Sequence, residues 1–287
     1  MRERRLVQAG ALLRRSGFQS LSRAVVTPDN VRVVLTHHVA AGLLDAYAGL
    51  VDLLLDERSP MTPQELLRVW PGGEPIEGRR LVFTFDDGLL SSYTAAQRVL
   101  APRGIKAMFF VPTAILDLRT DAEQHDFFRS RVYTRPPVTL PADNYRTMTA
   151  EHLRELHAQG HMVLPHTHSH ARLADLIDEA TLRAELERPK AILEDLLDTR
   201  CDAFAFPFGH ERVVAPAPYR RVQELFAACF TGFSGVNTKA TDPHFLYRDC
   251  VHPHFSASHT RSVCGGVFDP YYRLKMRRLK RRAGATR

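Results

Sequence analysis

Paired cysteines and long apolar runs are both missing from this 287-residue sequence. The cysteines form no C-x-x-C pair, which argues against a zinc ribbon and a small disulfide-stapled domain. No stretch approaches the ~20 apolar residues of a membrane-spanning helix. Arg14 and Arg15 interrupt the apolar part of the N-terminus, and no A-x-A cleavage site follows, so no signal peptide is predicted. We therefore expect a cytoplasmic protein with reduced cysteines.

Acidic residues are absent from the stretch Tyr271 to Arg287, which carries eight of the basic residues behind the net charge of +7. A solvated tail is the ordinary outcome for such a stretch. Peripheral contact with an anionic membrane, at its inner face for a cytoplasmic protein, is the second interpretation. Nucleic acid ranks third, because no nucleic-acid-binding module accompanies the charge.

The composition, 44% hydrophobic and 25% charged, is typical of a globular chain that buries a full core. Three parts are predicted: a basic helical extension over 1–28, a main domain over 29–268 and the basic tail over 269–287. Within the main domain, 116–147 shows little periodicity and contains Arg135-Pro136-Pro137. We expect it to be a long loop over one rim of the domain.

Short apolar runs alternate with helical patterns along the main domain. The predicted strands are Val31–Thr36, Leu81–Phe85, Ala107–Val111, Met162–Leu164, Ala203–Phe206, Cys229–Phe233 and Leu246–Val251. Between them, Thr62-Pro63-Gln64-Glu65 is a capping box, and Thr149 caps a helix that ends before Gly160. This alternation predicts an α/β fold with a mainly parallel sheet, open or closed into a barrel.

Two adjacent carboxylates, Asp86 and Asp87, follow the second predicted strand directly. An Asp-Gly turn is the ordinary interpretation of such a pair. The carboxyl ends of parallel strands are, however, where α/β proteins place active sites. There, one carboxylate can bind a metal ion while its neighbour acts as a base.

A histidine-rich turn, His166-Thr167-His168-Ser169-His170, follows the fourth predicted strand. Its outer pair has the i, i+4 spacing that lets two imidazoles converge on one ion. With one carboxylate they form a three-ligand set that leaves positions open for water and substrate. After the fifth strand, Phe206-Pro207-Phe208-Gly209 predicts a sharp turn able to expose a backbone N–H to an oxyanion.

Four other histidines are candidates for a general acid, namely His37, His38, His252 and His254. Side chains alternate along a strand, so His37 and His38 cannot both face the mouth of a barrel. Both faces of a barrel strand are apolar, and alternation alone therefore does not choose between them.

Three motifs in this order, Thr84–Gly88, His166-Thr167-x-x-His170 and Phe206–Gly209, resemble the polysaccharide deacetylase (NodB-homology, carbohydrate esterase) family. The resemblance spans roughly Val31 to Phe255. It implies a distorted (β/α) barrel with fewer than eight strands, about seven in this chain. Ala205 stands where many members carry an arginine, so the resemblance is to the branch that includes poly-N-acetylglucosamine deacetylases.

The resemblance also implies roles for individual residues. Asp86 is expected to be the base, and the Phe208 N–H to hold the oxyanion. Asp87, His166 and His170 are expected to bind one divalent metal ion. The branch's Tyr-His-Arg-Val pattern selects His38 as the acid. Substrate contacts are expected at Pro207, Gly209 and Arg248.

Together these features predict metal-assisted hydrolysis of the N-acetyl groups of a sugar or polysaccharide. Zinc is the first choice of metal, with cobalt, nickel or iron also compatible with the ligand set. The alternative is a catalytically inactive barrel that binds glycans or lipid-linked sugars. A peptide-cleaving metalloenzyme would be expected to carry H-E-x-x-H, which the sequence lacks.

Overall fold

The computed structural model describes residues 28–70, 72–133, 145–210 and 212–285. The strands are β1 (Asn30–Thr36), β2 (Ser59–Pro60), β3 (Arg79–Phe85), β4 (Ala107–Val111), β5 (Met162–Pro165), β6 (Ala203–Ala205), β7 (Ala228–Phe230) and β8 (Asp249–Cys250). The α-helices are α3 (Leu44–Leu55), α4 (Pro63–Val69), α5 (Leu90–Ala95), α6 (Asp121–Phe127), α7 (Ala150–Ala158), α8 (Glu179–Leu182), α9 (Arg188–Leu197), α10 (Pro216–Leu225), α11 (Ala257–Cys264) and α12 (Asp269–Arg282).

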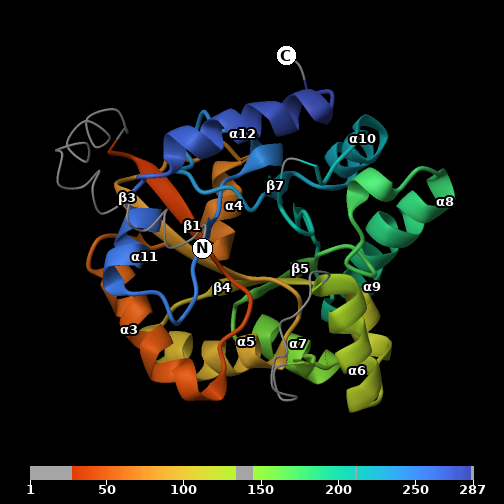
Figure 1. Ribbon diagram of the computed structural model, residues 1–287, viewed down its shortest axis with the longest axis horizontal. Coiled ribbons are helices and arrows are strands. Elements are labelled where there is room, and N and C mark those ends of the chain that lie inside the picture. The colour runs from red at the N-terminus through yellow and green to blue at the C-terminus, as the bar shows by residue number, and fades with distance from the viewer. Residues whose placement is uncertain (1–27, 71, 134–144, 211, 286–287) are drawn as a thin grey trace.

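The strands form a parallel barrel that the helices surround (Figure 1). One sheet has the order β5-β4-β3-β1-β8, with β2 added to β3, and a second sheet pairs β6 with β7. A parallel bridge from Phe230 to Leu246 connects the second sheet to the chain just before β8. The expectation of a distorted (β/α) barrel is therefore confirmed.

The central strands are apolar because helices cover their outer faces and the barrel interior covers the others. Every residue of β1 and of β4 is buried. The rings of Phe85 and Phe109 stack across β3 and β4 with centroids 5.0 Å apart. Pairing between β1 and β3 runs in parallel from Asn30 opposite Arg79 to Thr36 opposite Phe85, so both strands end at the same rim.

The segment predicted as a long loop, 116–147, contains regular structure that the prediction missed. Helix α6 begins with a capping box in which Thr120 and Glu123 bond each other's backbone N–H. A π-helical turn, Phe128–Val132, follows it directly. Both Phe127 and Phe128 are buried, so apolar packing stabilises a segment that lacks a clear helical period. The remainder, 134–144, lies outside the described residues.

The stretch predicted as a basic tail is instead helix α12, packed on the barrel. The side chains of Met276 and Leu279 on its inner face are buried, and its exposed charged residues lie on the outer side. The predicted N-terminal extension, 1–28, lies outside the described residues except for Pro28. Within the described ranges, no helix is both long and apolar enough to cross a bilayer.

Candidate active site

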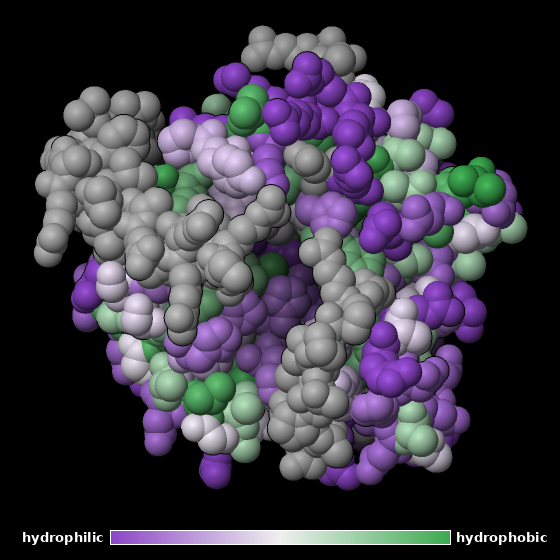
Figure 2. Space-filling view, in the orientation of Figure 1, coloured by the Kyte–Doolittle hydropathy of each residue, from purple (hydrophilic) through white to green (hydrophobic). Residues whose placement is uncertain are grey.

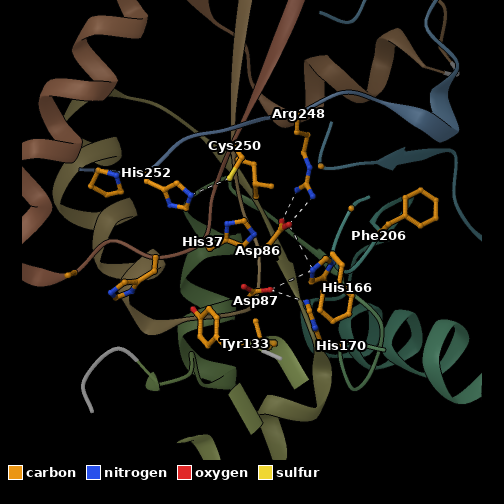
Figure 3. A pocket seen from close by; sticks show the side chains of 18 of the residues that line it. His37, Asp86, Asp87, Tyr133, His166, His170, Phe206, Arg248, Cys250 and His252 are labelled. Atoms are coloured by element: carbon orange, nitrogen blue, oxygen red, sulfur yellow. Dashed lines mark hydrogen bonds and ion pairs between the residues drawn. The ribbon is translucent and has the colours of Figure 1, made fainter. Parts of the chain in front are cut away.

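The residues predicted to carry chemistry meet at the carboxyl rim of the barrel. Asp86 and Asp87 follow β3, His166 and His170 follow β5, and Arg248 immediately precedes β8. All five line one pocket of about 690 Å³. Figure 2 shows the surface hollowed near the centre of the view, with hydrophilic residues around the hollow, and Figure 3 shows the lining side chains.

Asp87, His166 and His170 form a buried group whose ligand atoms all lie within 4.8 Å of one another. The distance from Asp87 Oδ1 to Nε2 is 3.7 Å for His166 and 3.3 Å for His170. Ligands at tetrahedral angles around one ion, each ~2.1 Å from it, lie about 3.4 Å apart. The three side chains therefore fit a single divalent ion.

Backbone carbonyls hold the far nitrogen of each of these imidazoles. His166 Nδ1 lies 2.8 Å from the Ala205 carbonyl, and His170 Nδ1 lies 3.0 Å from the Arg131 carbonyl. Carbonyls only accept, so each Nδ1 carries the proton and each Nε2 keeps its lone pair for a metal ion. The first bond crosses from β5 to β6. The second comes from the segment that follows α6.

The environment favours the ligand forms of these groups. Burial lowers the pKa of His166 to about 4, although the negative charge of Asp86 opposes this. Burial alone would raise the pKa of Asp87, but the contact with His170 and the positive charge of His37 hold it below its usual range. A neutral imidazole and an ionised carboxylate are the forms that bind metal.

Backbone strain is concentrated in the same turns. Five non-glycine residues have a positive φ in the part of the chain that the structure describes. Four of them belong to the predicted motifs: Asp87 (74°), Thr167 (60°), His170 (59°) and Phe208 (64°). Left-handed backbone is costly for these residue types, and it gathers at sites where side-chain direction matters.

Asp86 is held in place by Arg248 and is not one of the three residues grouped to bind a metal ion. The guanidinium makes two hydrogen bonds to the carboxylate, Nη1 to Oδ1 at 2.7 Å and Nη2 to Oδ2 at 2.8 Å. Its Nε donates to the Thr231 carbonyl at 2.8 Å. Arg248 also lines the pocket, and its predicted contact with substrate stays a prediction.

The turn after β6 presents Phe208 and Gly209 to the pocket. The Phe208 ring packs edge-on against His170, with centroids 4.7 Å apart. Its backbone N–H finds no acceptor among the described residues. Gly209 lies against the backbone of the segment that follows β7, since a Cβ there would lie 2.4 Å from Gly232 N. Pro207 is buried outside the pocket lining, which is not the position expected of a substrate contact.

Of the four candidate acids, His37 lies nearest the carboxylates. Its ring lies between the two aspartates and Cys250 (Figure 3), whereas His38 Nδ1 lies 2.7 Å from Ser91 Oγ. Burial lowers the pKa of His37, but a hydrogen bond with Cys250 and the charges of Asp87 and Asp86 outweigh it and raise the pKa to about 10. His37 therefore carries a proton at neutral pH in this environment.

His252 and His254 lie farther out along the same wall of the pocket. His252 Nε2 lies 3.7 Å from Cys250 Sγ, and its ring stacks on His254 with centroids 5.3 Å apart. Burial raises the pKa of Cys250, but hydrogen bonds with His252 and His37 outweigh it and lower the pKa to about 6. The sulfur of Cys250 thus interacts with both histidines.

Two polar side chains of the pocket were missed by the sequence analysis, Tyr133 and Cys250. Tyr133 follows the π-helical turn, and burial raises the pKa of its hydroxyl. Nothing in its neighbourhood marks it, because the surrounding sequence has no clear period. Cys250 is the last residue of β8, where it pairs with Leu35 of β1. It stands two residues before His252, which was the only available signal.

Comparison with known proteins adds an independent finding. A family model described as "Polysaccharide deacetylase" matches residues 73–221, more than half of the chain. No curated protein gives a significant match.

Several solved structures share the fold. Streptococcus pyogenes deacetylase PplD, in complex with acetate, is 17% identical with a TM-score of 0.62, covering 83% of this chain and 99% of its own. IcaB from Ammonifex degensii is 21% identical with a TM-score of 0.62, covering 83% and 97%. The BpsB deacetylase domain from Bordetella bronchiseptica is 20% identical with a TM-score of 0.59, covering 79% and 98%.

Proposed function

The chain belongs to the polysaccharide deacetylase family, as its motifs indicated, and from this premise we propose that it removes N-acetyl groups from an N-acetylglucosamine-containing glycan with one bound divalent ion. The observation that carries the proposal is the convergence of Asp87, His166 and His170 beside an Asp86 that Arg248 holds in place. The restriction to N-acetylglucosamine rests on the resemblance carried by Ala205 and the turn that follows it.

Asp87, His166 and His170 would hold the ion, and zinc suits their one-oxygen, two-nitrogen donor set. The ion would supply Lewis-acid chemistry, polarising the acetyl carbonyl and lowering the pKa of water. Cobalt, nickel or iron would fit the same donors. The protein's part is to bind, orient and move protons around that centre.

Asp86 is proposed as the general base. Arg248 fixes both carboxylate oxygens, which sets the orientation of the carboxylate. Each carboxylate oxygen has two lone pairs, so it can still accept the proton of an attacking water. His166 Nε2 lies 3.9 Å from Asp86 Oδ2, which places the base beside the metal ligands without making it one of them.

The oxyanion and the leaving amine would be served by the opposite walls of the pocket. The unpaired N–H of Phe208 is proposed to donate to the oxyanion of the tetrahedral intermediate. His37, rather than the predicted His38, is proposed to protonate the departing amine, because it is the histidine beside the aspartates. Acetate and a free amino sugar would be the products.

Acetate release from short N-acetylglucosamine oligomers tests the proposal. The chelated full chain should be inactive, and added zinc, cobalt, nickel or iron should restore release. Asp86→Asn, reconstituted in the same way, is the matched control and should stay inactive. Glycan binding without acetate release under every metal would instead support the alternative, an inactive glycan-binding barrel.

A further inference from the structure

Helix α12 carries an outer face that no other part of the described chain covers. Along it, the spacing of Tyr271, Leu274, Arg278 and Arg281 is three, four and three residues, so their side chains share one stripe. Tyr271 is 55% and Leu274 is 48% exposed, and these are two of the three large hydrophobic residues exposed in the described ranges. The third, Ile177, lies elsewhere on the surface.

The same face is strongly basic. Arg277, Arg278, Arg281 and Arg282 are exposed, and none forms a salt bridge to a carboxylate in the described part of the chain. By contrast, Lys280 on the flank is neutralised by Asp242 at 2.8 Å. Figure 2 shows hydrophilic residues gathered over α12, with a small hydrophobic patch among them.

The helix is fixed firmly to the barrel. At its first residue, Asp269 Oδ2 accepts from Arg32 Nη2 at 2.6 Å, and Arg32 also binds Asp249 at 2.8 Å. These buried ion pairs join α12 to β1 and β8. Met276 and Leu279 anchor the inner face in the core. The outer face is therefore a preformed surface rather than a flexible tail.

We propose that this face docks on an anionic lipid bilayer. Exposed arginines attract acidic headgroups, each removed charge weakening partition roughly fivefold. An apolar side chain and a tyrosine one turn apart are suited to the headgroup boundary, where such groups gain by leaving water. A dissolved polyanion satisfies the arginines but does not bury Leu274. The pairing of exposed apolar side chains with unneutralised charge therefore favours lipid.

Docking on this face leaves the pocket open. Figure 1 places α12 along the edge of the barrel, whereas the strand ends that hold the pocket lie near the centre of the view. A bilayer against α12 would hold the enzyme at the membrane surface without covering its carboxyl rim. This inference does not rest on the proposed function, because none of its residues belongs to the pocket.

Vesicle co-sedimentation of the full chain tests the docking surface. We expect binding to phosphatidylcholine vesicles that contain phosphatidylglycerol, release at high salt, and no binding to phosphatidylcholine alone. The triple variant Arg277→Gln, Arg278→Gln, Arg281→Gln should bind at least tenfold more weakly. A matched triple variant, Arg98→Gln, Arg129→Gln, Arg154→Gln, removes equal charge from the exposed surface of other elements and should bind normally.

A fluorescent variant separates lipid from a dissolved polyanion. Leu274→Trp should show a blue-shifted emission with phosphatidylglycerol vesicles and no shift with double-stranded DNA, since only lipid buries the ring. The native Trp70 is buried and gives a constant background. Equal weakening by both triple variants, or a blue shift absent from vesicles, would overturn the proposal.

Discussion

Arg248 and Asp86 form a two-point ion pair inside the pocket although 162 residues separate them in the chain. Both side chains are buried, with exposed fractions of 1% and 4%. A paired guanidinium and carboxylate fix each other's plane as well as their charge, which a lysine in the same place would not do. The pair thus ties the base to the last strand of the barrel.

Replacing Arg248 should damage both the fold and the chemistry. Arg248→Gln leaves the Asp86 carboxylate buried without its charged partner, and we expect a loss of about 3–5 kcal/mol of unfolding free energy. Arg248→Lys keeps the charge but not the two-point geometry, and turnover should fall with bound metal unchanged. Denaturant unfolding, acetate release and metal analysis measure the three quantities. Normal turnover in Arg248→Lys would show that the two-point geometry is unimportant.

Mutation should distinguish the roles of the two neighbouring aspartates. Asp86→Asn should lower turnover about 10²–10⁴-fold, the usual contribution of a general base, while metal content stays at the wild-type level. Asp87→Asn should lose metal instead, because its carboxylate is one of the three proposed ligands. Metal analysis of the purified variants decides between them. Loss of metal from Asp86→Asn would mean that the two roles are exchanged.

The strands and the metal-ligand group were accessible to sequence reasoning because their signals are local. Apolar runs bounded by turns located every strand except the two-residue β2, and adjacent carboxylates with i, i+4 histidines identified the group that converges. The Arg248–Asp86 pair was not accessible, because it depends on a barrel closing between distant segments. Helix α12 was missed because its apolar stripe is short and its composition is mostly basic. The cytoplasmic location stays a prediction.

The choice between His37 and His38 shows a second limit of sequence reasoning. Both residues lie beyond the end of β1 and both line the pocket, so the expectation from strand alternation that only one of them could face its mouth was wrong. Their contacts differ, since His38 bonds Ser91 and His37 lies by the aspartates, and this difference is the reason that His37 is proposed as the acid.

His37→Ala should therefore lose turnover about 10²–10⁴-fold, as expected for a general acid. His38→Ala should keep most of its activity, because its ring nitrogen is engaged with Ser91. Both variants should bind metal normally, which is checked before the rates are compared. His252→Ala is the third variant to compare. If it alone abolishes acetate release, the general acid is His252, which follows β8.

A buried histidine outside the site should make stability depend on pH. His161 is 1% exposed, and its Nδ1 accepts a hydrogen bond from the Ala107 N–H at 3.0 Å. Burial, with a smaller contribution from the positive charge of Lys106, lowers the pKa of His161 from 6.5 to about 4. The native imidazole therefore stays neutral through a range in which an unfolded one takes up a proton.

The sign follows from that difference. Between pH 6.5 and about 4 the unfolded chain binds the extra proton, so the unfolding free energy falls as the pH falls. The full effect is about 3 kcal/mol, and above pH 6.5 the residue contributes no slope. His161→Gln keeps an acceptor for Ala107 and should flatten this part of the curve. Denaturant unfolding of the metal-free protein across this range measures it, with exposed His125→Gln as the control. Buried His166 contributes a slope of the same sign to every variant, so the difference from wild type isolates His161. An unchanged slope in His161→Gln would show that this imidazole is protonated as readily in the native state as in the unfolded one.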